Sequence, residues 1–376
     1  MAVINYLTTV HIDFGAIRML GAELQRLGIQ RPLIVTDRGI RAAGIADKVL
    51  DALGPDCTPT VFEDTPSNPT EAAVSAATGL YLGNGCDGIV AVGGGSPIDL
   101  GKATALLATH PAPLQTYAAV EGGASRITSR VAPLVAIPTT AGTGSEVGRG
   151  AVIVMESGRK LGLLSPFLLP KLAICDPELT LGLPPALTAA TGMDAIAHCI
   201  ETFLAPAINP PAEAIALDGL RRGVANIGKA TADGSDRDAR WNMMMAAMEG
   251  ALAFQKGLGA VHALSHPLGA VPGVSLHHGT LNAVLLPAVL RFNKPATQAK
   301  QAALAQAMGL PAGGDPVQAI SDLNARLGLP AGLGAMGVPR DVLEDIAVAA
   351  TKDHCHATNP RIATVDDYMA MLQESY

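Results

Sequence analysis

The first half of the chain alternates short apolar runs, which are typical of buried strands, with longer segments of helical periodicity. The strand candidates are residues 33–36, 60–62 and 88–92, and the helical segments that follow them are 40–53, 70–82 and 99–107. Near-continuous apolar character is typical of parallel strands that helices cover on both faces. This strand–helix alternation predicts a doubly wound α/β domain.

The pattern changes near residue 181, after which helical periodicity dominates and β-type runs are nearly absent. The helical segments are 186–204, 212–227, 237–254, 281–293 and 300–308, and Gly/Pro-rich connections cover 309–316 and 328–339. A length of 376 residues fits two domains of roughly 100–200 residues each. We therefore expect an α/β domain over residues 1–180 and an all-α domain over residues 181–376.

Charge and composition argue against several classes of protein. A net charge of −7 without any cluster of Lys or Arg argues against a nucleic-acid partner. The N-terminus shows no secretion signal, and no apolar stretch reaches the roughly 18 residues of a membrane span. Five scattered cysteines without a CxxC pair are typical of free thiols in a reducing compartment. We therefore expect a cytoplasmic protein with no membrane partner.

A glycine-rich turn, GGGSP at residues 93–97, follows the strand candidate 88–92 and precedes a helix. Glycines at such a turn let backbone N–H groups approach a phosphate, and the helix N-terminus adds a partial positive charge. We expect Ser96 to cap the helix, with Pro97 in its first turn. A tight turn without a ligand gives the same pattern, and the turn lacks the GxGxxG spacing.

A second loop of small hydroxyl residues and glycines, PTTAGTGSE at residues 138–146, follows the apolar run 135–137. Two such loops in one α/β domain favour a dinucleotide over a single phosphate. Asp37 follows the first strand candidate, where a carboxylate accepts hydrogen bonds from a ribose 2′-hydroxyl and repels a 2′-phosphate. Asp37 thus favours NAD over NADP, and an aspartate that caps a helix or turn is the alternative.

A carboxylate and several histidines gather in the helical half. Asp194 and His198 are four residues apart in a helical pattern, so their side chains share one helix face. His262 and His266 have the same spacing, and HHG at residues 277–279 follows. One Asp with three His is a mixed oxygen and nitrogen set that suits Fe²⁺ or Zn²⁺. A single histidine on an apolar face is usually a core residue, but this grouping favours a metal site.

Five ordered motifs carry a resemblance to a known family. They are GGGSPIDLGKA (93–103), PTTAGTGSEV (138–147), GMDAIAHCIE (192–201), HALSHPLGA (262–270) and HHGTLNAVLLP (277–287). In this order they resemble the iron-containing (group III) alcohol dehydrogenases, over nearly the whole chain. The resemblance implies a Rossmann-like NAD(P) domain, a helical domain of the architecture shared with dehydroquinate synthase, and a metal in the cleft between them.

The resemblance also implies roles for particular residues. The metal ligands would be Asp194, His198, His262 and His278. His277 stays an alternative to His278, because the spacer before it is two residues longer than in the commonest members. His266 would lie near the nicotinamide and position groups or move a proton. The cofactor would contact Gly94, Gly95, Ser96, Asp99, Thr139, Thr140, Thr143, Ser145 and Lys160.

Arg149 departs from many relatives, which carry a neutral residue after the cofactor loop. An arginine that faces the substrate binds a carboxylate with two parallel hydrogen bonds. The motifs GSEVGRG (144–150) and RFN (291–293) are similar to the 4-hydroxybutyrate dehydrogenase branch. A structural ion pair of Arg149 with Glu146 or Glu156 is the alternative. The run DHCH at 353–356 either adds polar groups to this pocket or ends a surface helix.

The resemblance implies a metal-dependent, NAD-linked alcohol dehydrogenase that forms a homodimer. It would transfer hydride between nicotinamide and a primary alcohol, such as the ω-hydroxy acid 4-hydroxybutyrate, with Fe²⁺ or alternatively Zn²⁺ bound. The same scaffold also serves maleylacetate reductases, glycerol dehydrogenases and dehydroquinate synthase-type lyases. The full Asp/His ligand set argues against the first of these and against a non-catalytic nucleotide-binding protein. The small number of basic residues argues against a lyase of a phosphorylated substrate.

Overall fold

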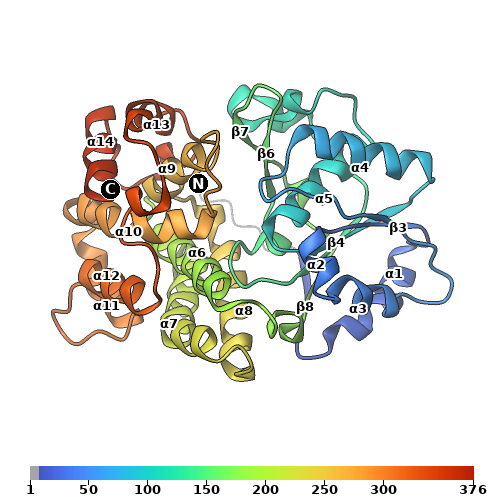
Figure 1. Ribbon diagram of the computed structural model, residues 1–376, viewed down its shortest axis with the longest axis horizontal. Helices are drawn as coiled ribbons and strands as arrows, with labels where there is room; N and C mark the ends of the chain where they lie inside the picture. Colours follow the sequence, from blue (N-terminus) through green and yellow to red (C-terminus); the bar gives the residue numbers. More distant parts are fainter. Residues whose placement is uncertain (1–7) are drawn as a thin grey trace. The chain divides into compact units, whose positions relative to one another are not determined.

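The computed structural model describes residues 8–376, which divide into two compact units. The α/β unit comprises residues 8–140 and 144–182, and the helical unit comprises residues 141–143 and 183–376. In Figure 1 the α/β unit runs from blue to green and the helical unit from yellow-green to red. Each unit is described by itself.

The α/β unit is built on a six-stranded, entirely parallel sheet with the order β1-β8-β5-β4-β2-β3. Its strands are β1 (Thr9–Ile12), β2 (Pro32–Val35), β3 (Thr60–Phe62), β4 (Gly88–Gly93), β5 (Leu134–Pro138) and β8 (Leu172–Cys175). Strands β2, β4, β5 and β8 are buried along their whole length. This explains their unbroken apolar character, because both faces of the sheet meet side chains.

Helices cover the two faces of this sheet with separate cores. They are α1 (Leu20–Leu27), α2 (Arg38–Ala42), α3 (Ile45–Asp51), α4 (Glu71–Gly83) and α5 (Gly95–Leu107). Side chains of α1 and α3 pack with one set of strand residues, and those of α4 and α5 pack with the alternate set. An antiparallel hairpin of β6 (Gly150–Val154) and β7 (Lys160–Leu164) completes the unit. The predicted α/β class is confirmed.

The helical unit surrounds α6, which is buried from Thr188 to Leu204 except for Thr191. Its helices are α6 (Pro185–Leu204), α7 (Pro210–Ala232), α8 (Arg237–Ala253), α9 (Ala260–Leu268), α10 (His278–Asn293), α11 (Gln298–Ala307), α12 (Pro316–Arg326), α13 (Leu343–Ala350) and α14 (Val365–Glu374). Helices α7, α8 and α10 pack directly on α6. Polar side chains on α6 therefore face protein on every side, which makes this helix a scaffold for a buried site. The predicted helical class is confirmed as well.

Several local expectations differ from the structure. The helix expected over 40–53 is two helices, because the chain turns at Gly44 with a left-handed backbone (φ 70°). Ser96 does not cap α5, since that helix starts at Gly95 with Gly94 as its cap, and the Ser96 hydroxyl donates to the Ser67 carbonyl at 2.6 Å. Strand β1 was not expected, because it is short and only half-buried at the edge of the sheet.

No helix within residues 8–376 combines the length and the apolar character that crossing a bilayer requires.

Candidate active site

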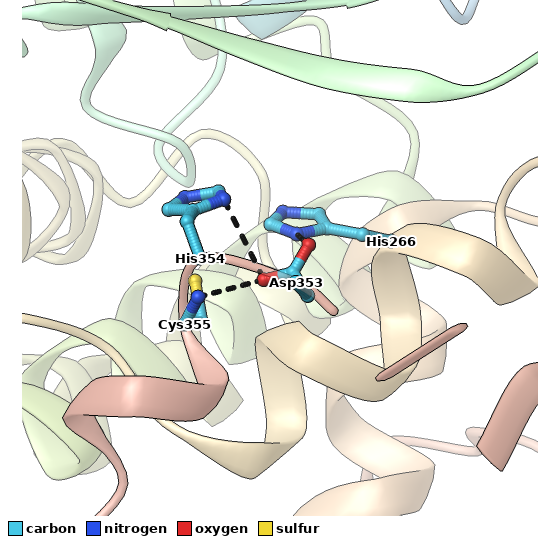
Figure 2. A group of neighbouring side chains, drawn as sticks. All are labelled: His266, Asp353, His354 and Cys355. Carbon is cyan, nitrogen blue, oxygen red and sulfur yellow. Dashed lines mark hydrogen bonds and ion pairs between the residues drawn. The ribbon is translucent and has the colours of Figure 1, made fainter. Parts of the chain in front are cut away.

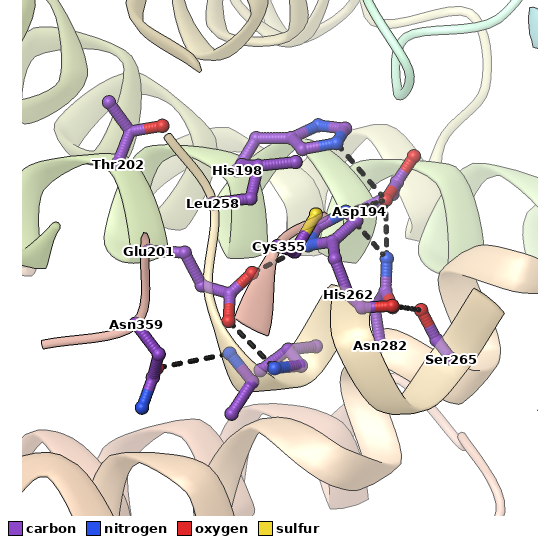
Figure 3. Close-up of polar contacts among 12 residues, drawn as sticks. Asp194, His198, Glu201, Thr202, Leu258, His262, Ser265, Asn282, Cys355 and Asn359 are labelled. Carbon is purple, nitrogen blue, oxygen red and sulfur yellow. Dashed lines mark hydrogen bonds and ion pairs between the residues drawn. The ribbon is translucent and has the colours of Figure 1, made fainter. Parts of the chain in front are cut away.

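Four predicted ligands converge in the helical unit around one carboxylate oxygen. The Nε2 atoms of His198, His262 and His278 lie 3.8, 3.7 and 3.7 Å from Oδ1 of Asp194. Figure 3 shows Asp194 and His198 on α6 opposite His262 on α9. The donor atoms of Asp194, His262 and His278 all lie within 4.8 Å of one another, close to the roughly 3.4 Å that separates ligands bound at about 2.1 Å to a tetrahedral metal ion. The donor set of one oxygen and three nitrogens fits Fe²⁺ or Zn²⁺.

The electrostatics favour metal-binding protonation states at Asp194 and His198. Burial alone would raise the pKa of Asp194, but the neighbouring His198, His262 and His278 hold it well below its usual range. Burial lowers the pKa of His198 to about 4, although Asp194 opposes this shift. Asp194 is therefore a carboxylate and His198 a neutral imidazole near neutral pH, and these are the forms that coordinate cations. At His262 burial lowers the pKa, but Asp194 and Glu201 outweigh it and raise the pKa to about 9, so a bound cation would have to displace a proton there.

The start of α10 distinguishes the two adjacent histidines. His277 is the exposed cap residue, whereas His278 is the first residue of the helix and reaches Asp194. A Cβ atom on Gly279 would overlap the carbonyl oxygen of Ala190, so only glycine lets α10 begin this close to α6. The geometry thus favours His278 over His277 as a ligand.

Asn282 is a site residue to which the sequence reasoning gave no role. Its Nδ2 donates to Oδ1 of Asp194 at 2.7 Å and lies 3.2 Å from Nε2 of both His262 and His278 (Figure 3 shows Asn282 beside Asp194). Asn282 lies one turn after His278 on α10, so its side chain shares the face of that ligand. The four-residue spacing between His278 and Asn282 is the only feature of the sequence that could have indicated a role for Asn282. A buried amide here fixes the orientation of the Asp194 carboxylate.

His266 lies beside the four ligands and belongs to a second group of side chains. Its ring centroid is 5.9 Å from that of His262 and 5.7 Å from that of His278. Its Nδ1 is 2.9 Å from Oδ2 of Asp353, and the ring of His354 stacks on it at 5.4 Å. Figure 2 shows the two rings next to each other, with the Asp353 carboxylate below them and Cys355 nearby.

The Asp353 carboxylate is held ionised. Burial would raise its pKa, but the neighbouring His266 and His354 hold it well below its usual range. The Cys355 N–H also donates to Oδ1 of Asp353 at 2.8 Å. An ionised carboxylate at Nδ1 makes that nitrogen the donor, which leaves Nε2 of His266 to face the site. The run 353–356 therefore contributes to the site through Asp353 and His354.

The predicted cofactor loops meet at one edge of the α/β sheet. Gly93 at the end of β4 pairs with Pro138 at the end of β5, so the residues that follow both strands leave the sheet side by side. Gly94 packs against the side chain of Thr140. The structure thus brings together Gly94, Gly95, Ser96, Thr139 and Thr140 at the N-terminus of α5, which is a favourable place for phosphate. Thr143 is grouped with the helical unit instead.

Asp99 and Ser145 form internal hydrogen bonds in the α/β unit. The Ser145 hydroxyl donates to Oδ1 of Asp99 at 2.6 Å, and the Val152 N–H donates to Oδ2 at 2.9 Å. Lys102, which is fully buried, donates to Ser145 Oγ and to the carbonyls of Gly148 and Gly150 at 2.7–2.8 Å. This network ties α5 to the hairpin and fixes the course of residues 145–150.

Three further predicted residues, Asp37, Lys160 and Arg149, have different contacts from one another. Oδ1 of Asp37 accepts from the Ile40 N–H at 2.8 Å, so Asp37 caps α2, which is the alternative that the sequence left open. Lys160 begins β7 and donates to Oδ1 of Asn68 at 3.1 Å. Arg149 is exposed, and across residues 8–376 no ion pair joins it to Glu146 or Glu156.

Buried Glu146 makes the stability of the α/β unit depend on pH. Burial raises its pKa from 4.5 to about 7. The folded state holds the Glu146 proton more tightly than the unfolded chain does. This stabilises the folded state fully below pH 4.5, and the stabilisation is lost as the pH rises through 7. Between these values each pH unit costs up to about 1.4 kcal/mol. We expect Glu146→Gln to flatten the pH dependence of the free energy of unfolding in this window, measured by urea titration.

The exposed Glu156 provides the control for this measurement, because Glu156→Gln should keep the wild-type pH dependence. If the free energy of unfolding changes with pH equally in the wild type and in Glu146→Gln, Glu146 is not the source of this pH dependence.

Comparisons with known proteins agree with this geometry. The family model for iron-containing alcohol dehydrogenase matches residues 8–177, and the model for the C-terminal part of the Fe-containing family matches residues 188–376. The 4-hydroxybutyrate dehydrogenase of Cupriavidus necator is 60% identical, with 100% of each chain covered. The 1,3-propanediol dehydrogenase of Klebsiella pneumoniae is 37% identical over 96% of this chain and 95% of its own.

Among solved structures, a 1,3-propanediol oxidoreductase matches with a TM-score of 0.94 and 35% identity over 100% of both chains. The resemblance that the five sequence motifs carry is therefore confirmed. The chain belongs to the iron-containing alcohol dehydrogenase family and is an oxidoreductase of that family.

Proposed function

We propose that the protein is a metal-dependent, NAD-linked dehydrogenase that interconverts an ω-hydroxy acid, such as 4-hydroxybutyrate, and its aldehyde. The observation that carries this proposal is the cluster of three imidazole Nε2 atoms at 3.7–3.8 Å from one Asp194 oxygen. The 60% identity to a 4-hydroxybutyrate dehydrogenase supports the substrate class.

Fe²⁺ is the proposed metal, with Zn²⁺ as the alternative, and Asp194, His198, His262 and His278 would hold it. A divalent cation bound there supplies Lewis-acid polarisation of the substrate oxygen, which lowers the pKa of an alcohol. The chain's own contribution is orientation: the buried carboxylate and imidazoles fix where a substrate oxygen binds, and the surrounding apolar core excludes water.

NAD is the proposed cofactor, held at the glycine and hydroxyl loops that follow β4 and β5. Backbone N–H groups at the start of α5 suit its diphosphate. The carboxylate of Asp37, at the end of β2, would repel the 2′-phosphate of NADP. Asp99, Ser145 and Lys160 support this site by shaping the segments around it.

His266 is the proposed residue that positions or moves a proton. Asp353 accepts a hydrogen bond from Nδ1, which leaves Nε2 as the atom that exchanges a proton with substrate, ribose or water. Hydride transfer itself takes place between the substrate carbon and the nicotinamide ring, and the protein's task is to align the two.

Arg149 is the proposed contact for the substrate carboxylate. Its guanidinium is exposed and forms no ion pair with the nearby acidic residues Glu146 and Glu156 of the described chain, so its five donors remain available for an anion. The planar guanidinium matches a carboxylate through two parallel hydrogen bonds.

Substrate kinetics test this assignment. In a steady-state screen of C2–C6 alcohols and ω-hydroxy acids with NAD, we expect Arg149→Ala to lower kcat/KM for 4-hydroxybutyrate roughly 10- to 100-fold, the value of a charge-assisted hydrogen bond. Simple alcohols should be unaffected. Arg159→Ala, which removes an exposed arginine paired with Glu121, is the matched control. If the wild type does not prefer carboxylated substrates, Arg149 does not have the proposed role. The same holds if Arg149→Ala keeps that preference.

We further propose that the enzyme acts in the cytoplasm as a homodimer, as the family resemblance implies. All five cysteines are free thiols, which suits a reducing compartment. Sedimentation velocity of the purified protein tests the dimer.

A further inference from the structure

The helix that carries His262 and His266 has an unusual N-terminus. Helix α9 begins at Ala260, and its cap residue Gly259 has no side chain to accept a hydrogen bond from the first turn. Side chains from distant segments accept these bonds instead: the Ala260 N–H donates to Oδ1 of Asn359 at 3.0 Å, and the Val261 N–H donates to Oε1 of Glu201 at 2.7 Å. Two orphan donors of the helix are thereby satisfied.

Gly259 is the residue that makes room for these acceptors. A Cβ atom at this position would lie 2.7 Å from Oδ1 of Asn359 and 2.8 Å from Oε1 of Glu201. A serine or aspartate, which usually caps helices, would collide with them. Helix α9 is therefore capped by Glu201 and Asn359 and not by a side chain of its own N-terminal segment.

The second oxygen of Glu201 contacts a proposed metal ligand. Oε2 lies 2.6 Å from Nδ1 of His262, and both residues are almost fully buried, at 4% and 1% exposed. A carboxylate oxygen only accepts hydrogen bonds, so Nδ1 of His262 carries the proton. In the neutral ring, which is the form that binds a cation, the lone pair is then on Nε2, which lies 3.7 Å from Oδ1 of Asp194.

Glu201 also shares a helix face with the ligands of α6. It follows Asp194 by seven residues and His198 by three, so all three side chains project from one side of α6. Figure 3 shows Glu201 beside His262, with Asn359 at the far side of the same carboxylate. One helix face therefore supplies two ligands and the group that orients a third.

We propose that Glu201 is a positioning residue of the metal site, which holds His262 as the Nδ1–H tautomer and directs its Nε2 toward the cation. This inference rests on the proposed function, because His262 must be a ligand. Hydrogen bonds from ligand imidazoles to carboxylates fix the ring and raise its basicity, and their loss typically weakens metal binding about 10- to 100-fold.

Glu201→Gln separates this role from the capping of α9. A glutamine oxygen can still accept from the Val261 N–H, but its amide NH₂ then faces Nδ1 of His262 and donates to it. That arrangement favours the Nε2–H tautomer, in which the nitrogen that faces Asp194 has no lone pair for a metal. The fold should persist while metal binding weakens.

Glu249→Gln is the matched control. Glu249 is a half-buried carboxyl on α8 that lies 3.5 Å from Arg222 and contacts no proposed ligand. Burial raises its pKa to about 8, so glutamine closely replaces its neutral form at pH 7.

The experiment measures the dissociation constant of Zn²⁺ for the full chain by competition with a coloured chelator, together with the thermal midpoint of each metal-free variant. We expect Glu201→Gln to bind Zn²⁺ about 10- to 100-fold more weakly, with a thermal midpoint close to that of Glu249→Gln. Unchanged Zn²⁺ affinity in Glu201→Gln would overturn the role of Glu201. A wild-type chain that binds no Zn²⁺ or Fe²⁺ would instead refute the proposed function.

The tautomer is also measurable in the wild type, so a variant that fails to fold does not end the test. Nitrogen-15 chemical shifts of the metal-free protein, labelled at histidine and assigned with a His262→Gln variant, should show His262 protonated at Nδ1. An Nε2–H tautomer there would overturn the proposal.

Discussion

Asp194→Ala should abolish metal binding and lower kcat/KM by about 10³-fold or more, because several kcal/mol of Lewis-acid stabilisation depend on the bound cation. Asp194 is the only carboxylate among the four proposed ligands, and its Oδ1 is the atom that the three Nε2 atoms surround. Its removal leaves three neutral imidazoles without a counter-charge for a divalent ion. Metal content after gel filtration, measured by mass spectrometry, and NAD-dependent turnover report the two effects.

Affinity for NAD provides an internal control in the same variant, since the proposed cofactor loops belong to the α/β unit. Asp238→Ala, at an exposed position in the first turn of α8, controls for the loss of an aspartate from the helical unit. Wild-type turnover by metal-free Asp194→Ala would show that the reaction does not need the metal.

The second large effect is expected for Asp353→Asn. Its carboxylate fixes the His266 proton on Nδ1, and an asparagine amide at this position would donate to Nδ1 and reverse the tautomer. Loss of a correctly oriented proton-transfer group costs about 10²- to 10⁴-fold in kcat. Metal content should stay at the wild-type level, because Asp353 contacts none of the four ligands through a hydrogen bond. Rapid-mixing kinetics of NADH formation would measure the chemical step directly.

Asp345→Asn removes an exposed carboxylate from α13, in the same part of the chain, and should leave kcat unchanged. If Asp353→Asn keeps the wild-type kcat, His266 does not depend on Asp353 for its role.

Much of the fold could be predicted from the sequence, because the informative patterns are local. The apolar runs at β2, β3 and β4 report burial on both sheet faces, and the helical period of α6 places Asp194 and His198 on one face. Short or partly exposed elements escaped prediction. Strand β1 is held by pairing with β8, a partner more than 150 residues away in the chain, and no local pattern reports such a contact.

The candidate site also combines features that local sequence patterns report with contacts that they do not report. Spacing pointed to a cluster of Asp194 with several histidines, and the family resemblance selected the four proposed ligands from it. The groups that orient these ligands come from distant segments. His266 and Asp353 are 87 residues apart, and His262 and Glu201 are 61 apart. Ser96 illustrates the opposite error: a favourable cap residue lies inside the helix, because α5 begins at Gly95 with Gly94 as its cap. Propensity is a weak guide where tertiary packing decides the first turn.

The Lys102 hydrogen bonds have a consequence for how this enzyme diverges from its relatives. The buried ammonium group binds the carbonyls of Gly148 and Gly150, the two neighbours of Arg149, so the backbone at position 149 is held without help from its own side chain. A substitution at position 149 should therefore leave the conformation of the loop and the positions of the proposed metal ligands unchanged. We expect this position to vary among relatives with the charge of their substrates, while Lys102 stays constant across them.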